Sequence, residues 1–214
     1  MTNCDRLKVV ILGNSRVGKS AVTVRYLTKR YIGEYSSFKD YLYQHSVSFD
    51  NVTTEVEILD TSACKTTACL HEHISWANAF VLVYSICEKA SFQQARVLLE
   101  TISAMKGLRY APVILLGNKR DLEHVRQVGV DDGHEMSLQF QCQFYEVSAA
   151  ENYVGVSLAF QSLIREARAM QALKTLPVRR KVGAAMTVSK MIGMVFGKSG
   201  KSLQNGKKRP SLSI

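Results

Sequence analysis

Short apolar runs recur along the chain and predict strands of a buried β-sheet. Each run has the length of a strand, and runs without alternating polar positions are expected where helices cover both faces of a sheet. The runs are Leu7–Leu12, Ala79–Tyr84, Pro112–Leu116 and Phe144–Val147. Because segments with helical spacing separate these runs, the pattern predicts an α/β fold with a mostly parallel sheet.

Between the first two runs, apolar and polar residues alternate on both sides of Asp50–Asn51. The alternation covers Tyr43 to Phe49 before the turn and Val56 to Ile58 after it. This pattern predicts a hairpin, and therefore one antiparallel strand, at an edge of the sheet.

Two segments have the apolar spacing of amphipathic helices. In the first, Ser91–Gln94 matches a capping box with Ser91 as the N-cap residue. Its predicted core face is Ala95, Leu98, Leu99, Ile102 and Met105. In the second, the apolar stripe is Val156, Ala159, Phe160, Leu163 and Ile164. Both stripes are expected to pack on the sheet.

The net charge of +10 is concentrated at one end of the 214-residue chain. From Gln171 onward there is no acidic residue, whereas ten of the 28 Lys and Arg residues lie there, so 18 basic residues face 18 acidic ones before that point. The ten are Lys174, Arg179, Arg180, Lys181, Lys190, Lys198, Lys201, Lys207, Lys208 and Arg209. This asymmetry indicates a boundary near residue 170 between a neutral domain and a basic tail.

Composition also narrows the class of protein. The chain has no run of roughly 18 apolar residues, so no transmembrane helix is expected. Residues Met1 to Lys8 lack the apolar segment of a signal peptide, so secretion is not expected either. The five cysteines form no CxxC pair, which argues against a disulfide framework or a zinc site. A cytoplasmic protein with reduced thiols is therefore expected.

The segment Gly13–Ser20 matches the phosphate-binding pattern G-x-x-x-x-G-K-[ST], and it lies between a predicted strand and a predicted helix. Backbone N–H groups of such a loop converge on phosphate oxygens at the positive end of a helix. Lys19 is expected to contact the β- and γ-phosphates, and the Ser20 hydroxyl is expected to coordinate Mg²⁺. The predicted phosphate site comprises Gly13, Asn14, Ser15, Arg16, Val17, Gly18, Lys19, Ser20 and Ala21.

Asn118-Lys119-Arg120-Asp121 follows the Pro112–Leu116 strand and indicates which base is bound. Ligands bind at the carboxyl ends of strands in open α/β sheets, and a carboxylate there can accept two hydrogen bonds from the N1–H and amine of guanine. Asp121 therefore predicts guanine over adenine. Ser148 and Ala149, after the next strand, are expected to supply a backbone N–H to the guanine carbonyl.

Asp60 ends the strand of the hairpin that follows the turn. A carboxylate at this position can hold Mg²⁺, directly or through water. Asp60 and Ser20 are therefore the predicted metal residues.

This ordered set of motifs resembles the Ras superfamily of small GTPases. The resemblance covers residues 1–170 as a Ras-type G domain, with 171–214 as a basic tail. It implies a P-loop fold with a six-stranded, mostly parallel sheet, one antiparallel edge strand and helices on both faces. The segment Leu27–Tyr35 is most similar to the oestrogen-regulated growth-inhibitor-like and Ras-like branches. By resemblance, Tyr31 is the aromatic residue that packs on guanine.

The resemblance implies a monomeric GTPase that binds GDP and GTP with Mg²⁺ and contacts effector proteins in signalling. However, four positions differ from the Ras pattern. Phe38 occupies the place of the metal-coordinating threonine, Ala63 that of a hinge glycine, and Cys64 that of the water-orienting glutamine. Ser15 replaces the glycine that leaves room for an arginine finger. Lys19 and the degenerate Cys64 are the catalytic candidates.

Three functions remain open from the sequence, and in the third the domain is an adaptor for a membrane- or nucleus-directed tail. The first is a small GTPase that hydrolyses GTP slowly, because a thiol is short and a weak hydrogen-bonding group. The second is a pseudo-GTPase, an interaction module that binds guanine nucleotide weakly or without switching.

Two other clusters in the same region carry weaker signals. His71-Glu72-His73 lacks the i, i+4 spacing of a helical zinc motif and is expected to be a solvated helix. Cys64 and Cys69 are not predicted to be a redox pair, because nothing in the sequence indicates a reactive thiol.

The tail ends without a Cys-a-a-X motif, so no prenyl anchor is expected. Its apolar residues Ala184, Ala185, Val188, Met191, Ile192 and Val195 recur at helical spacing among basic residues. The segment is therefore either a flexible solvated tail or a basic amphipathic helix that binds an anionic membrane, calmodulin or another partner. A nuclear location is a further alternative to a cytoplasmic or peripheral membrane one.

Overall fold

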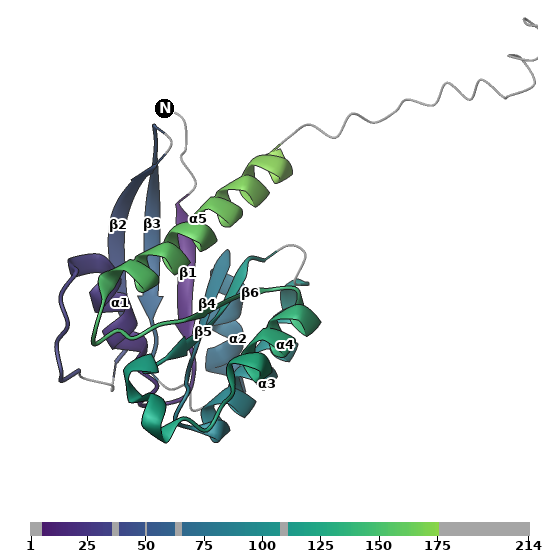
Figure 1. The fold of residues 1–214 in the computed structure, drawn as a ribbon. Helices are drawn as coiled ribbons and strands as arrows, with labels where there is room; N and C mark the ends of the chain where they lie inside the picture. The colour runs from purple at the N-terminus through teal and green to yellow at the C-terminus, as the bar shows by residue number, and fades with distance from the viewer. Residues whose placement is uncertain (1–5, 36–38, 50, 63–65, 108–110, 176–214) are drawn as a thin grey trace, which may run out of the picture. The chain divides into compact units, whose positions relative to one another are not determined.

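A computed structural model describes residues 6–35, 39–49, 51–62, 66–107 and 111–175. The strands of the described part form one six-stranded sheet in the order β2-β3-β1-β4-β5-β6 (Figure 1). Their bounds are β1 Leu7–Leu12, β2 Tyr41–Phe49, β3 Val52–Asp60, β4 Ala79–Ser85, β5 Val113–Asn118 and β6 Gln143–Glu146. This is the predicted α/β architecture with a mixed sheet.

The directions of the strands confirm the predicted hairpin at the edge. β2 pairs with β3 in antiparallel fashion, and the partners closest to the turn are Phe49 and Val52. The other neighbouring strands are parallel. Parallel strands place their carboxyl ends at one edge of the sheet, and this edge carries the candidate site.

Helices cover both faces of the sheet, as Figure 1 shows. The α-helices are α1 Lys19–Thr28, α2 Thr67–Trp76, α3 Lys89–Lys106, α4 Val130–Phe140 and α5 Tyr153–Thr175, and a 3₁₀ helix spans Arg120–Val125. Side chains of α1 and α5 pack on one face, where the rings of Tyr26 and Phe160 stack with centroids 4.2 Å apart. Side chains of α2, α3 and α4 pack on the other face. The stripe predicted for α5 is buried throughout.

Two expectations for α3 were wrong. The helix begins at Lys89 with Glu88 as the N-cap residue, so Ser91 lies inside the first turn. Ser91 is buried, and its hydroxyl donates to the Glu88 carbonyl at 2.7 Å and accepts the Ser85 N–H at 3.0 Å. Met105, expected in the core, is 38% exposed.

Helix α5 continues to Thr175, beyond the boundary inferred near residue 170. The division into a G domain and a basic tail stays a prediction. Among the described residues, no helix is long and apolar enough to cross a membrane.

Candidate nucleotide-binding site

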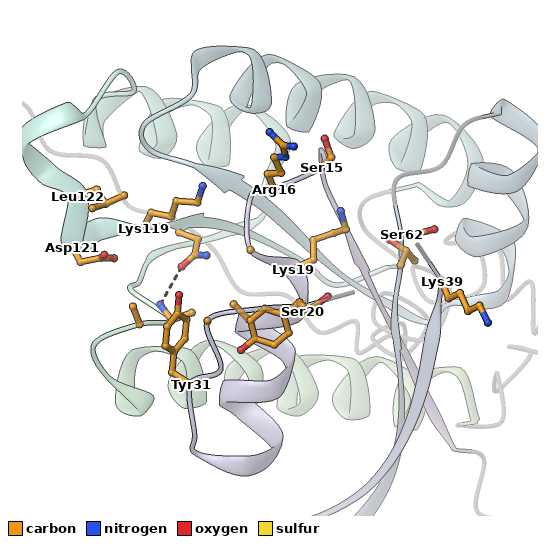
Figure 2. A pocket seen from close by; sticks show the side chains of 18 residues that line it. Ser15, Arg16, Lys19, Ser20, Tyr31, Lys39, Ser62, Lys119, Asp121 and Leu122 are labelled. Carbon is orange, nitrogen blue, oxygen red and sulfur yellow. Dashed lines mark hydrogen bonds between the residues drawn. The ribbon is translucent and has the colours of Figure 1, made fainter. Parts of the chain in front are cut away.

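A cavity of about 410 Å³ lies at the carboxyl edge of the sheet. Figure 2 shows Lys119 and Asp121 on one side of it, Lys39 and Ser62 on the other, and Lys19 and Ser20 between them. The volume is in the range of small-molecule sites, and polar side chains from several loops converge on it.

The phosphate-binding loop is built around two glycines with positive φ. Gly13 has φ of 149° and Gly18 has φ of 97°. A Cβ at Gly13 would collide with the Val83 carbonyl, and one at Gly18 would collide with the side-chain amide of Asn118. Glycine is therefore required at both positions by backbone conformation and by close packing.

The side chain of Lys19 folds back over the phosphate-binding loop that precedes it. Its Nζ donates to the carbonyl oxygens of Gly13 at 3.0 Å and Asn14 at 2.8 Å, and the residue is only 7% exposed. These bonds place the ammonium group over the loop, where a phosphate chain would lie at the N-terminus of α1. A buried cation at this point is suited to binding a polyphosphate.

Asn118 connects the phosphate loop to the loop after β6. Its Nδ2 donates to the Val17 carbonyl at 3.0 Å, and its Oδ1 accepts the Ala149 N–H at 3.1 Å. The side chain is buried, so both bonds are made away from solvent. Asn118 thus fixes the distance between the predicted phosphate and base regions.

Asp121 is positioned by Ser148. The Ser148 hydroxyl donates to Asp121 Oδ1 at 2.6 Å and accepts the Glu151 N–H at 3.0 Å. This pair orients the carboxylate, and Asp121 lines the cavity. The carboxylate is an acceptor and matches the two donors of the guanine edge, whereas the same edge of adenine does not offer them.

Asp60 is a buried carboxylate whose Oδ1 has no hydrogen-bond partner in the structure. Burial raises the pKa of Asp60, and a hydrogen bond from Ser20 and the charge of Lys19 partly oppose that rise. An unpartnered buried carboxylate oxygen beside a hydroxyl is a donor set that fits a hard divalent cation. The side chains of Ser20 and Asp60 are therefore chemically suited to hold a Mg²⁺ ion.

Arg25 was not predicted as part of the site, yet it supports one wall. Its Nε donates to the Ala149 carbonyl at 2.6 Å and its Nη2 to the Ala150 carbonyl at 2.5 Å. Its guanidinium also lies 5.7 Å from the ring centroid of Tyr31, which is 47% exposed and lines the cavity. Arg25 is a charged residue at a buried position of α1, and no local sequence pattern marked it because its burial is known only from the structure.

The segment before β2 is joined to the segment after β3 by Asp40. Its Oδ1 accepts the Ser62 N–H at 2.7 Å and the Ser62 hydroxyl at 2.8 Å, and its Oδ2 lies 3.0 Å from His73 Nε2. His73 is 8% exposed, so the expectation of a fully solvated cluster at His71-Glu72-His73 was wrong for this residue. No sequence motif identified the link, because its members are far apart in the chain.

Most of the predicted site residues line the cavity, and the others do not. The predicted residues that line it are Ser15, Arg16, Gly18, Lys19, Ser20, Ala21, Tyr31, Asn118, Lys119, Asp121 and Ala149. Those that do not line it are Gly13, Asn14, Val17, Asp60 and Ser148. Lining residues that were not predicted are Gly33, Tyr35, Lys39, Thr61, Ser62, Leu122 and Ala150.

The predictions at Phe38, Ala63 and Cys64 lie outside the described residues. Their roles toward the γ-phosphate are therefore inferred from the sequence alone.

Comparison with known proteins agrees with this geometry. Residues 8–169 match the Ras family. The Ras-related and estrogen-regulated growth inhibitor-like protein of Bos taurus is 37% identical over 204 residues, covering 92% of this chain and 98% of that protein. The Ras-related and estrogen-regulated growth inhibitor of Homo sapiens is 37% identical over 168 residues, covering 78% of this chain and 84% of that protein. Ras-like protein family member 12 of Danio rerio is 42% identical over 166 residues, covering 77% and 65%.

The phosphate-binding loop pattern, the mixed six-stranded sheet and the match to the Ras family define a guanine-nucleotide-binding domain. The chain belongs to the Ras family, in the branch of the estrogen-regulated growth inhibitors and Ras-like proteins, and is a Ras-type GTP-binding protein.

Proposed function

We propose that the protein binds GDP and GTP together with Mg²⁺, hydrolyses GTP slowly and acts in signalling through effector proteins. The observation that carries the nucleotide part is the connected set Lys19, Asn118, Asp121 and Ser148, whose hydrogen bonds prepare a phosphate region and a base region at a fixed separation. The metal part is supported by the unpartnered Oδ1 of buried Asp60.

Each residue has a separate task in this proposal. Lys19 neutralises negative charge on the β- and γ-phosphates, and the backbone of the phosphate loop donates to their oxygens. Asp121 selects guanine, and Tyr31 contributes an aromatic face to the base region. Ser20 and Asp60 hold Mg²⁺, which when bound supplies further neutralisation of phosphate charge.

Slow hydrolysis follows from the residues that replace those of Ras. Phosphoryl transfer depends on positioning and electrostatic stabilisation, so a lost water-orienting group reduces the rate directly. Cys64 cannot span the distance that a glutamine amide spans. Ser15 also occupies the space that an arginine finger would need, and such a finger is worth roughly 10³–10⁵ in rate.

The first experiment identifies the nucleotide. Purified full-length protein is denatured and the released nucleotides are separated by chromatography; we expect guanine nucleotides and no adenine nucleotide. Asp121→Asn should lose them, because its amide places a donor against the donors of guanine. Asp131→Asn, an exposed carboxylate on α4, is the matched control and should retain them. Adenine nucleotide in the native protein would contradict the proposal.

The second experiment measures hydrolysis. Single-turnover cleavage of loaded GTP is compared between the native protein, Cys64→Gln and Cys64→Ser. We expect the glutamine variant to be faster by about tenfold or more and the serine variant to match the native protein. A native rate equal to that of the glutamine variant would contradict the assigned effect of Cys64.

A pseudo-GTPase remains the second candidate, and the Asp40 link favours it. In that function the segments before β2 and after β3 are joined by protein side chains and do not report the γ-phosphate. Equal binding of an effector to the GDP-loaded and GTP-loaded forms would favour this candidate, and a preference for the GTP form would favour the switch.

We also propose that the protein is a cytoplasmic monomer whose basic tail attaches it to anionic membrane surfaces. The support is the ten basic and no acidic residues from Gln171 onward. Each basic residue near such a surface adds about 1 kcal/mol of attraction. Calmodulin binding and nuclear location are the alternatives that the same charge allows.

A further inference from the structure

Cys69 lies in the first turn of α2, where the helix end is positive. The helix begins at Thr67 after the N-cap Thr66, whose hydroxyl accepts the Cys69 N–H at 3.3 Å. The unpaired N–H groups of a first turn favour a negative charge nearby, and cysteines at such positions are among the reactive ones. The Cys69 thiol therefore lies close to the positive end of the helix.

An imidazole faces the thiol from the next turn of the same helix. Cys69 Sγ is 4.0 Å from His73 Nδ1, and His73 Nε2 is 3.0 Å from Asp40 Oδ2. In the neutral tautomer that carries its proton on Nε2, the ring donates to Asp40 and presents Nδ1 to the sulfur as a proton acceptor. A nucleophile, a base and a carboxylate that orients the base are thus arranged in sequence.

The other described cysteines differ from Cys69 in their surroundings. Cys87 Sγ donates to the Leu122 carbonyl at 3.7 Å. Burial raises the pKa of Cys142 to about 11, which disfavours its thiolate. Of the three cysteines in the described ranges, Cys69 alone combines a helix N-terminus with an oriented imidazole.

Two lysines from elements that pack on α2 contact its C-terminal end. Lys8 of β1 is 5.4 Å from the ring centroid of Trp76. Lys106 of α3 donates to the carbonyls of Ser75 at 2.9 Å and Ala77 at 3.3 Å. Asp40, just before β2, contacts the imidazole of His73. On α2 itself, His71 and Glu72 lie between Cys69 and His73 in the sequence.

We propose that Cys69 is a site of reversible modification by low-molecular-weight disulfides such as glutathione disulfide. His73 Nδ1 accepts the thiol proton, and the resulting imidazolium is stabilised by Asp40. The Cys69 thiolate attacks one sulfur of the disulfide, so a new S–S bond forms as the original S–S bond breaks. The second half of the reagent leaves as a thiolate. A free thiol in solution reverses the modification by the same exchange reaction.

Modification of Cys69 also affects the link between the two segments that Asp40 joins. His73 is buried and its ring lies between the sulfur and the carboxylate. A tripeptide attached to Sγ adds bulk beside this ring, and we infer that it displaces the ring and breaks the contact with Asp40. The modified protein therefore loses one of the two connections that hold Asp40, leaving only those to Ser62.

The reaction is tested on the full-length protein with glutathione disulfide and peptide mass mapping, which gives a rate for each cysteine. At neutral pH we expect Cys69 to react about tenfold faster than Cys87, and faster in the folded protein than in the urea-unfolded chain. His73→Gln should slow Cys69 several-fold and displace its rate–pH profile to higher pH, whereas Asp40→Asn should have a smaller effect in the same direction.

Two results would overturn the site. One is a Cys69 rate no greater than that of Cys87 or of the unfolded chain; this comparison needs no variant and so survives any folding defect. The other is a rate–pH profile that His73→Gln leaves unchanged. A His124→Gln variant, with its histidine in the exposed 3₁₀ helix, is the matched control and should leave Cys69 unaffected.

The effect on the link is measured at the Ser62 amide, which donates to Asp40. In ¹⁵N-labelled protein carrying glutathione only on Cys69, the Ser62 resonance should shift and its amide hydrogen should exchange faster. Cys69→Ser treated in the same way should show neither change. An unchanged Ser62 amide in the modified protein would refute the structural consequence.

Discussion

At the scale of single residues, the site depends on a few buried polar groups that each serve two loops. Asn118 bonds both Val17 and Ala149, and Asp40 bonds both Ser62 and His73. When the side chain of such a residue is removed, two partner groups lose their hydrogen bonds. The free energy of unfolding therefore falls by more than it does when a single hydrogen bond is lost.

For this reason Asn118→Ala is expected to lower both stability and nucleotide affinity. Each buried group left unpaired costs about 1–3 kcal/mol. Thermal unfolding with and without GDP should show a lower midpoint in both conditions and a smaller shift on adding GDP. Gln44→Ala, which removes an exposed amide on β2, is the control and should change neither. A normal GDP shift in Asn118→Ala would contradict the role of this residue as a connection between the two regions.

Asp60 should affect stability with opposite sign in the metal-free and metal-bound protein. Burial raises the pKa of Asp60 in the folded protein above its value in the unfolded chain. Protonated Asp60 therefore favours the folded state at pH values below the unfolded-state pKa, and this stabilisation is lost as the pH rises through the folded-state pKa. Asp60→Asn is therefore expected to raise the melting temperature of nucleotide- and metal-free protein near neutral pH. With Mg²⁺ and GDP, the native protein should be stabilised more than the variant.

The comparison requires unfolding curves in chelator and in Mg²⁺ with GDP across the acidic to neutral range. Asp131→Asn serves as the exposed control. If Asp60→Asn destabilised the metal-free protein at neutral pH, burial of this carboxylate would not be the dominant effect.

At the scale of elements, the predicted strands and helices follow from short-range patterns. The start of α3 was predicted wrongly, and α4 and the 3₁₀ helix were not predicted. The predicted hairpin and β1 agree with the structure because alternation and apolar runs are local properties. The prediction of a capping box at Ser91–Gln94 was wrong. The Ser91 hydroxyl lies within the first turn of the helix and accepts a hydrogen bond from the Ser85 N–H at the end of β4.

The connection between β4 and α3 can be measured through Ser91→Ala. The substitution leaves the buried Ser85 N–H unpaired, so we expect a loss of about 1–3 kcal/mol in the free energy of unfolding. Chemical denaturation gives this value. Ser103→Ala on the same helix is the control, and it should be neutral or slightly stabilising because alanine favours the helix. Equal effects of the two substitutions would show that helix propensity, and not the bond to Ser85, is what is measured.

At the scale of the whole molecule, the chemistry of the folded domain and the charge of the tail are separable. The described part of the domain contains the candidate nucleotide-binding cavity, and the excess positive charge lies from Gln171 onward. Function at the site should therefore persist without the tail, and attraction to anionic surfaces should not.

A chain ended after Thr175 is expected to keep its guanine nucleotide and to lose binding to vesicles that contain phosphatidylserine. Full-length protein should bind these vesicles at low salt and dissociate as salt screens the charges. Co-sedimentation over a series of salt concentrations tests this. Vesicles of neutral phosphatidylcholine are the control, and equal binding of both chains to anionic vesicles would exclude the tail as the attachment.

The sequence by itself determined the class of fold, and it predicted the phosphate loop and the selectivity for guanine. These features depend on neighbouring residues, such as Gly13 to Ser20 and Asn118 to Asp121, whose spacing allows few alternative structures. The tertiary structure decided which distant residues meet. It placed Arg25 against the Ala149–Ala150 carbonyls and Asp40 between Ser62 and His73, and it placed the Cys69 thiol beside an oriented imidazole. Contacts of this kind arise from the packing of helices on the sheet, and no local pattern in the chain encodes them.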